Sequence, residues 1–222
     1  MMQLFVGLIA EGTTDIRFLK NIIYRSIQEL SWQCNNQVEV FDIREIIAEG
    51  DSFLNKMLAA SKCAQQEYGL SALCIHADSD ARTIKEVMEN KFTPFFKALE
   101  NMPEDEYCKH IIPTIPIQMI ESWMLADKEL LKQLINAVGI RDIDLGIEKA
   151  PETYSNPKHT IENAIRIAMS GQSKKKRDQI SISDLYEVLG NRLELDKLRA
   201  IPSFANFEEN ILKVFREKKL MK

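Results

Sequence analysis

Residues 4–19, LFVGLIAEGTTDIRFL, contain the signals for a strand, a turn and the start of a helix. Residues 4–10 form an almost continuous apolar run, which is typical of a strand buried on both faces of a parallel sheet. From residue 15 onward the apolar side chains follow helical spacing, with Thr13 or Thr14 as the expected N-cap. Glu11 and Gly12 are therefore expected at the turn between the strand and the helix.

The first half of the chain repeats this alternation of strand and helix. Further strands are expected at 38–43, 72–77 and 109–117, and further helices at 51–69, with Asp51 as N-cap, and at 83–100. An interruption of the last helix is expected near Pro94, and Pro113 favours an edge position for the last strand. These patterns predict an α/β fold, an open and mostly parallel sheet flanked by helices.

The second half of the chain is predicted to be helical. Helical periodicity is found at 119–138, 158–169, 183–193 and 204–219, whereas 140–157 lacks a clear period and is expected to form a loop. We place a boundary near residue 118. Residues 1–118 would form an α/β catalytic core, and residues 119–222 a helical extension packed on that core.

Composition excludes some classes of protein and leaves others open. The chain has 222 residues and a net charge of −4, so affinity for nucleic acid would have to come from a local basic patch. The four cysteines form no CxxC pair, which favours a reducing cytoplasm over a disulfide or zinc framework. The N-terminal apolar run is too short for a secretory signal or a membrane span, so we expect a cytoplasmic protein without a membrane partner.

Acidic residues follow two of the predicted strands. Asp78 and Asp80, in CIHADSDAR, come directly after the strand at 72–77, and Glu11 follows the first strand. The carboxyl ends of parallel strands lie at one edge of a sheet, so these three carboxylates are expected to converge there. Oxygen-only ligands without histidine or cysteine suit a hard cation, Mg²⁺ or Mn²⁺, better than Zn²⁺. The alternative is that Asp78 caps the following helix.

Three further residues have two interpretations each. Glu121 lies in the apolar stretch MIESWMLAD and is either a fourth carboxylate near the metal or a residue on the exposed face of a helix. Asp15 either interacts with the dipole of the helix that it starts or binds the metal, with the first role favoured. His76 is interpreted as a satisfied core residue rather than a site residue.

A basic segment provides candidate phosphate ligands. A helix is expected to begin with Asn156 as N-cap and Pro157 as first residue, which places Lys158 near a helix N-terminus, where anions bind readily. The tract SGQSKKKRD adds four consecutive basic residues, Lys174, Lys175, Lys176 and Arg177. The alternative is a solvated loop without a partner, whereas the functional interpretation is that these residues contact nucleic-acid phosphates.

Two motifs resemble a known family. LIAEGTTD, followed later by HADSDA, resembles the Toprim fold of topoisomerases, bacterial primases and overcoming-lysogenization-defect nucleases, whose signature is Glu-Gly after the first strand and DxD after the third. This resemblance covers residues 3–117. The added stretch IPIQMIESWMLAD resembles an uncharacterised family of small standalone Toprim-like proteins of prokaryotes, with relatives encoded beside ATPases and associated with phage defence.

The resemblance implies roles for particular residues. Glu11 would be a general acid/base or a metal ligand, Asp78 and Asp80 would ligate one or two Mg²⁺ ions, and Glu121 would join them. The chain carries no cysteine-rich zinc domain and no recognisable strand-passage domain, which argues against a primase or a topoisomerase. No GxxxxGK[ST] motif occurs, so ATP hydrolysis would require a separate ATPase chain.

The expected function is a Mg²⁺-dependent nuclease, or a related phosphoryl-transfer enzyme, acting on DNA or RNA. Two alternatives stay open. One is a non-catalytic metal-binding regulatory subunit of an ATPase complex, and the other is a DxD metal-dependent nucleotide-sugar transferase. Assembly into a homo-oligomer is also left open.

Overall fold

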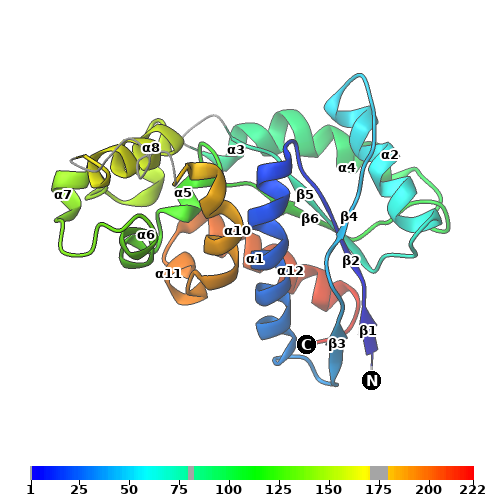
Figure 1. Cartoon of the computed structure of the whole chain (residues 1–222). Helices are drawn as coiled ribbons and strands as arrows, with labels where there is room; N and C mark the ends of the chain where they lie inside the picture. The colour runs from blue at the N-terminus through cyan, green and yellow to red at the C-terminus, as the bar shows by residue number, and fades with distance from the viewer. Residues whose placement is uncertain (1, 80–82, 171–179) are drawn as a thin grey trace.

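A parallel sheet forms the centre of the molecule (Figure 1). The computed structural model describes residues 2–79, 83–170 and 180–222. The sheet has the strand order β4-β2-β5-β6, with every neighbouring pair parallel; the strands are β2 (Val6–Ile9), β4 (Arg44–Glu45), β5 (Ala72–His76) and β6 (Ile111–Thr114). Two more strands, β1 (Met2–Leu4) and β3 (Val38–Val40), form a separate parallel pair. The predicted α/β class is confirmed.

Helices cover both faces of the sheet because its central strands are apolar on both sides. Along β5, Ala72 and Cys74 contribute to one hydrophobic core, while Leu73 and Ile75 contribute to the other. The first face is covered by α1 (Thr13–Ser31) and α12 (Pro202–Glu217). The second face is covered by α2 (Phe53–Gln66), α3 (Ile84–Val87), the π-helical turn η1 (Met88–Phe92) and α4 (Thr93–Glu100).

The described elements after β6 are all helical. They are α5 (Glu121–Met124), α6 (Lys128–Leu134), α7 (Asp142–Leu145), the 3-10 turn η2 (Pro151–Thr153), α8 (Pro157–Ala168), α10 (Ile182–Arg192), α11 (Leu195–Arg199) and α12. Helix α10 packs closely along α1, where a Cβ on Gly190 would lie 2.6 Å from the carbonyl oxygen of Phe18. These helices and one face of the sheet share a single hydrophobic core. None of the described helices is long and apolar enough to cross a membrane.

Several boundaries differ from the prediction. The N-cap of α1 is Gly12, not Thr13 or Thr14, because the Asp15 carboxylate accepts a hydrogen bond from the Gly12 amide at 2.9 Å. Ser52 caps α2 by accepting a hydrogen bond from the Asn55 amide, so the expectation of Asp51 in that position was wrong.

The other differences arise where a predicted helix is interrupted or where a short helix was not recognised. The helix predicted over 119–138 is two short helices, because Asp127 caps α6 with a hydrogen bond from the Leu130 amide. The segment 140–157, expected to be a loop, contains the short elements α7 and η2. The interruption near Pro94 is confirmed as the π-helical turn η1.

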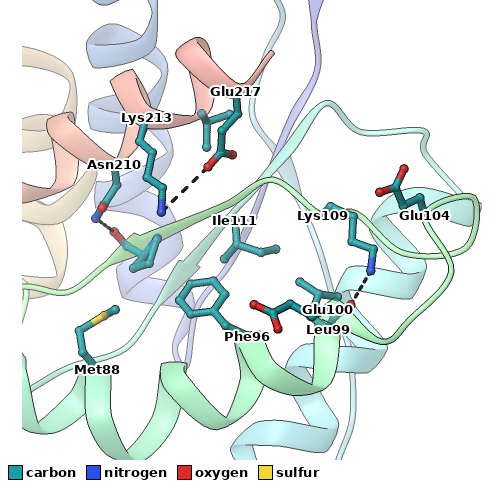
Figure 2. A pocket seen from close by; sticks show the side chains of 12 residues that line it. Met88, Phe96, Leu99, Glu100, Glu104, Lys109, Ile111, Asn210, Lys213 and Glu217 are labelled. Atoms are coloured by element: carbon teal, nitrogen blue, oxygen red, sulfur yellow. Dashed lines mark hydrogen bonds and ion pairs between the residues drawn. The ribbon is translucent and has the colours of Figure 1, made fainter. Parts of the chain in front are cut away.

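Strand β6 lies at the edge of the sheet, as Pro113 predicted. Figure 2 shows a pocket of about 550 Å³ beside this edge, with Phe96 and Ile111 among the apolar residues of its wall. The Asn210 side chain donates a hydrogen bond to the Pro113 carbonyl at 3.2 Å (Figure 2). Proline has no amide hydrogen, and this carbonyl has a partner, so the exposed edge is partly protected from pairing with another strand.

Candidate functional site

The candidate site lies where β2 and β5 end side by side. Ile9 pairs in register with Ile75, and Glu11 and Asp78 each follow two residues after the end of their strand. After β2 the chain moves to β4 on one side, and after β5 it moves to β6 on the other side. Parallel sheets form a ligand-binding crevice at such a switch in strand order.

His76 is buried at the centre of this strand edge. Its Nδ1 lies 3.1 Å from the Thr114 carbonyl oxygen, and because a carbonyl only accepts, Nδ1 carries the proton. Its Nε2 lies 3.3 Å from Asp78 Oδ1 and 3.8 Å from Asp15 Oδ2. Burial opposes the charged imidazolium, but the two carboxylates outweigh burial, and the pKa of His76 is raised.

Asp15 has the helix-start role that was favoured for it, and it also lies beside the candidate site. It caps α1 through the Gly12 amide, and it also faces His76 across the site. Burial raises the pKa of the Asp15 carboxyl, the charge of Asp78 raises it further, and the charge of His76 lowers it. Whether Asp15 binds a metal stays a prediction.

Glu121 is buried in the first turn of α5, so its placement on an exposed helix face was wrong. Tyr186, on α10, donates a hydrogen bond to Glu121 Oε1. Burial raises the pKa of the Glu121 carboxyl, as does the charge of Asp78, while the Tyr186 hydrogen bond and the charge of Lys158 lower it. Glu121 therefore lies within electrostatic range of both the acidic edge and the basic helix start.

Glu11 has different neighbours from the other carboxylates. Its side chain is 59% exposed, and its Oε1 lies 3.9 Å from the ammonium group of Lys91. It lines a pocket of about 410 Å³ that His76 also lines. Glu11 and Asp78 therefore share an edge of the sheet, but Asp78 is not among the residues that line this pocket.

Of the basic residues predicted to bind phosphate, only Lys158 lies in the described part of the chain. Lys158 is exposed in the first turn of α8, which begins as predicted with Asn156 as N-cap, accepting a hydrogen bond from the His159 amide, and Pro157 as first residue. Asp80 and the basic tract, Lys174, Lys175, Lys176 and Arg177, lie outside the described residues.

Two supporting contacts could not be found from the sequence. The Gln118 amide, on a residue with φ of 65°, donates a hydrogen bond to Ser79 Oγ at 2.8 Å and so fixes the backbone beside Asp78. Tyr186 reaches Glu121 across 65 positions of chain. No local pattern around these residues indicates either contact.

The donor chemistry fits a hard divalent cation. Asp78 Oδ1 is buried and faces His76 Nε2 at 3.3 Å, whereas no hydrogen bond among the described residues engages the other carboxylate oxygen, Oδ2, which is therefore available for a ligand. Within that part of the chain, no three His, Cys, Asp or Glu side chains are grouped as a metal site requires. A complete ligand set would therefore need Asp80 or a rearrangement of Glu11.

A comparison of the chain with family models, curated proteins and solved structures finds no match.

Proposed function

We propose that the chain is a Toprim-like nuclease, or a related phosphoryl-transfer enzyme, that uses Mg²⁺ or Mn²⁺ and acts on DNA or RNA. The observation that carries this proposal is the Asp78 carboxylate at the carboxyl edge of two adjacent parallel strands, with Oδ1 facing His76 and with no hydrogen bond to Oδ2 among the described residues. Asp15 and Glu121 add negative charge around it. A cation would relieve the repulsion among these groups.

The motif order supports the Toprim assignment. The Glu11-Gly12 pair follows β2, and Asp78 follows β5, the strand hydrogen-bonded to it in parallel. Glu11 and Asp78, one acidic residue from each motif, therefore lie at one edge of the sheet, which supports the resemblance. A separate ATPase chain remains a proposal that rests on the family resemblance alone.

In this proposal some residues would bind the cation, and His76 lies beside one of those metal ligands. Asp78, Asp80 and Glu11 would bind the cation, with Glu121 beside them. The cation would act as a Lewis acid on the phosphodiester oxygens. His76 holds its proton at Nδ1 against Thr114, and its raised pKa favours a positive charge on the ring beside Asp78.

Other residues orient the site or attract the substrate. The Ser79–Gln118 hydrogen bond fixes the loop that carries Asp78. Tyr186 engages one oxygen of Glu121 and orients that carboxyl. Lys158, exposed near Glu121, supplies positive charge for a phosphate of the nucleic-acid backbone.

The test is a cleavage assay with labelled single- and double-stranded DNA and RNA in Mg²⁺, Mn²⁺ or EDTA. We expect cleavage only with a metal, and a loss on the order of 100-fold or more in the Asp78→Asn variant, since it removes a charged ligand. The matched control is Asp105→Asn, on an exposed aspartate away from the strand ends. Equal cleavage by Asp78→Asn and the wild type, or cleavage in EDTA, would refute the proposed site.

A further inference from the structure

Gln118 has a backbone conformation that is unusual for a residue with a side chain. Three non-glycine residues in the described part of the chain have a positive φ: Gln118 at 65°, Asn136 at 57° and Lys219 at 58°. A positive φ is disfavoured for such residues because Cβ comes too close to the backbone. Strained residues persist where the surrounding structure holds them, and they cluster at functional sites.

Asn136 and Lys219 have an ordinary explanation. Each directly follows the C-cap of a helix, α6 for Asn136 and α12 for Lys219. In both, the amide two residues after the C-cap donates a hydrogen bond back into the last turn, as the Ala137 amide does to the Lys132 carbonyl at 2.7 Å. This is the common left-handed end of a helix. Gln118 follows a strand, so it needs a different explanation.

Gln118 is the central residue of a three-residue turn between β6 and α5. The Met119 amide donates a hydrogen bond to the Ile117 carbonyl at 3.0 Å, which together with the positive φ of Gln118 makes the strained and rare form of the γ-turn. The Gln118 amide takes no part in this hydrogen bond and donates instead to Ser79 Oγ at 2.8 Å. The strained residue thus contacts the loop that carries Asp78.

The Ser79–Gln118 hydrogen bond extends the link between two strands past the end of the sheet. The Ala77 amide, directly after β5, donates to the Thr114 carbonyl of β6 at 3.3 Å. Ser79 is buried and makes its contact with Gln118 beyond the ends of both strands. The chain on both sides of Asp78 is therefore tied to β6 and to the turn that follows it.

The same turn sets the start of α5. The Ser122 amide donates a hydrogen bond to the Met119 carbonyl at 2.9 Å, so the first turn of α5 is built directly on the γ-turn. Glu121 lies in that first turn, three residues after Gln118, and accepts the hydrogen bond of Tyr186. The two carboxylates of the candidate site thus meet their supports at one strained residue.

We propose that Gln118 is a positioning residue, which sets the Asp78 and Glu121 carboxylates relative to each other through its backbone and not through its side chain. Metal ligands are oriented by the groups that hold them, and a ligand set that is fixed beforehand binds its ion more tightly. The role of these carboxylates as metal ligands rests on the proposed function. The link between the Asp78 loop and the start of α5 does not.

The first experiment measures Mn²⁺ affinity in Gln118→Gly, Gln118→Asn and Gln118→Val. Glycine adopts a positive φ freely, asparagine tolerates it, and the β-branched valine opposes it. Electron paramagnetic resonance of the free ion gives the affinity. We expect the Gly and Asn variants within about twofold of the wild type and the Val variant about tenfold weaker, the loss typical of residues that orient metal ligands. Equal affinities in the three variants, whether weakened or unchanged, would overturn the role of the backbone.

The matched control applies the same changes to Asn136, which has a similar φ in the connection between α6 and α7. Asn136→Gly and Asn136→Val should both bind Mn²⁺ within about twofold of the wild type, because this turn contacts neither carboxylate loop. A tenfold loss in Asn136→Val would show that strain anywhere in the chain weakens the metal site, and it would overturn the assignment to Gln118.

The second experiment needs no metal. Hydrogen exchange followed by NMR in EDTA measures the protection of the amide of residue 118. Ser79→Ala removes its acceptor and should accelerate this exchange about tenfold, while the Ile75 amide inside β5 keeps its wild-type rate. Gln118→Gly should keep the protection. An unchanged rate of the residue 118 amide in Ser79→Ala would overturn the link between the two loops.

The two experiments separate the inference from the proposed function. A wild type that binds no Mn²⁺ would overturn the proposed function, and hydrogen exchange would still decide whether Ser79 holds Gln118. Mn²⁺ binding by the wild type, with equal affinities of the Gly and Val variants, would overturn the inference and leave the proposed function standing. Thermal unfolding followed by circular dichroism establishes that each compared protein is folded at the temperature of measurement.

Discussion

At the scale of single residues, the site depends on buried polar groups that hold one another in place. His76 connects Thr114 on β6 with the carboxylates of Asp78 and Asp15. Tyr186 connects α10 with Glu121 on α5. Each of these side chains is costly to bury alone, so the fold and the acidic edge are stabilised by the same contacts.

The Tyr186 hydroxyl gives a direct test of this dependence. Tyr186→Phe removes the donor and leaves a buried carboxyl oxygen of Glu121 unpaired, which should lower the free energy of unfolding by about 1–3 kcal/mol. Urea denaturation measures the change. Tyr24→Phe is the control, because the half-buried Tyr24 hydroxyl makes no hydrogen bond among the described residues, and its stability should stay within about 0.5 kcal/mol of the wild type. Equal stability of the two variants would contradict the role of Tyr186.

Only part of the site could be predicted at this scale. The positions of Glu11 and Asp78 could be predicted because each residue follows an apolar run, and the ends of neighbouring parallel strands lie together. His76 was interpreted as a core residue outside the site; it is buried and paired with Thr114 at Nδ1, but its Nε2 faces Asp78 and Asp15. The ring orientation depends on Thr114, 38 positions away, which no local pattern indicates.

At the scale of secondary-structure elements, the contact between α1 and α10 positions the start of α1 beside the strand edge. Phe18 on α1 lies against Gly190 on α10, and the Arg25 guanidinium donates a hydrogen bond to the Gly190 carbonyl at 3.1 Å. The helices approach closely because residue 190 has no side chain. This contact joins the helix that carries Asp15 to the helix that carries Tyr186.

Gly190→Ala should disturb this contact. The added methyl group would lie 2.6 Å from the Phe18 carbonyl oxygen, which is backbone and cannot rotate away. We expect a loss of about 1–3 kcal/mol in the free energy of unfolding, despite the higher helix propensity of alanine. Glu187→Ala, on an exposed position of the same helix, is the control and should leave stability nearly unchanged. A more stable Gly190→Ala protein would contradict the close contact.

Elements were predicted best where burial determines the sequence pattern. The central strands β2 and β5 are buried at every position, so they are continuous apolar runs in the sequence. Helix ends were predicted less well, since the start of α1 depends on a single hydrogen bond between Asp15 and Gly12. The short helices α5 and α6 share one apolar stretch, and its interruption by the Asp127 cap was not recognised.

At the scale of the whole molecule, the sheet and the C-terminal helices share one hydrophobic core. Trp123 on α5 is fully buried and packs against Phe204 and Phe207 of α12, while its indole NH donates a hydrogen bond to Ser203 Oγ at 2.7 Å. The same core includes Phe18 of α1 and Leu8 of β2. The predicted boundary near residue 118 therefore crosses a continuous core.

This shared core predicts the behaviour of a fragment. Residues 1–118 alone would expose the face of α1 and of the sheet that α10 and α12 cover in the full chain. We expect this fragment to lack a cooperative thermal transition and to aggregate, because that apolar face would be exposed to water. A soluble fragment with a sharp transition by circular dichroism would show instead that residues 1–118 fold independently.

The thiols test the arrangement of both cores. Cys74 and Cys108 are buried, and burial raises the pKa of the Cys108 thiol to about 11, whereas Cys34 and Cys63 are partly exposed. In the folded protein at pH 8, a thiol reagent such as dithionitrobenzoate should therefore react with Cys34 and Cys63 only. All four thiols should react in denaturant. Rapid reaction of Cys74 in the folded protein would contradict the central position of β5.

The central claim is that the carboxyl edge of β2 and β5 binds a divalent metal through Asp78. Anomalous diffraction from crystals soaked in Mn²⁺ tests this claim most directly, because it locates the ion without requiring turnover. We predict an anomalous peak at coordination distance from the Asp78 carboxylate, and its loss in crystals of the Asp78→Asn variant. Mn²⁺ bound only at other positions, or none at this edge at saturating concentration, would contradict the account.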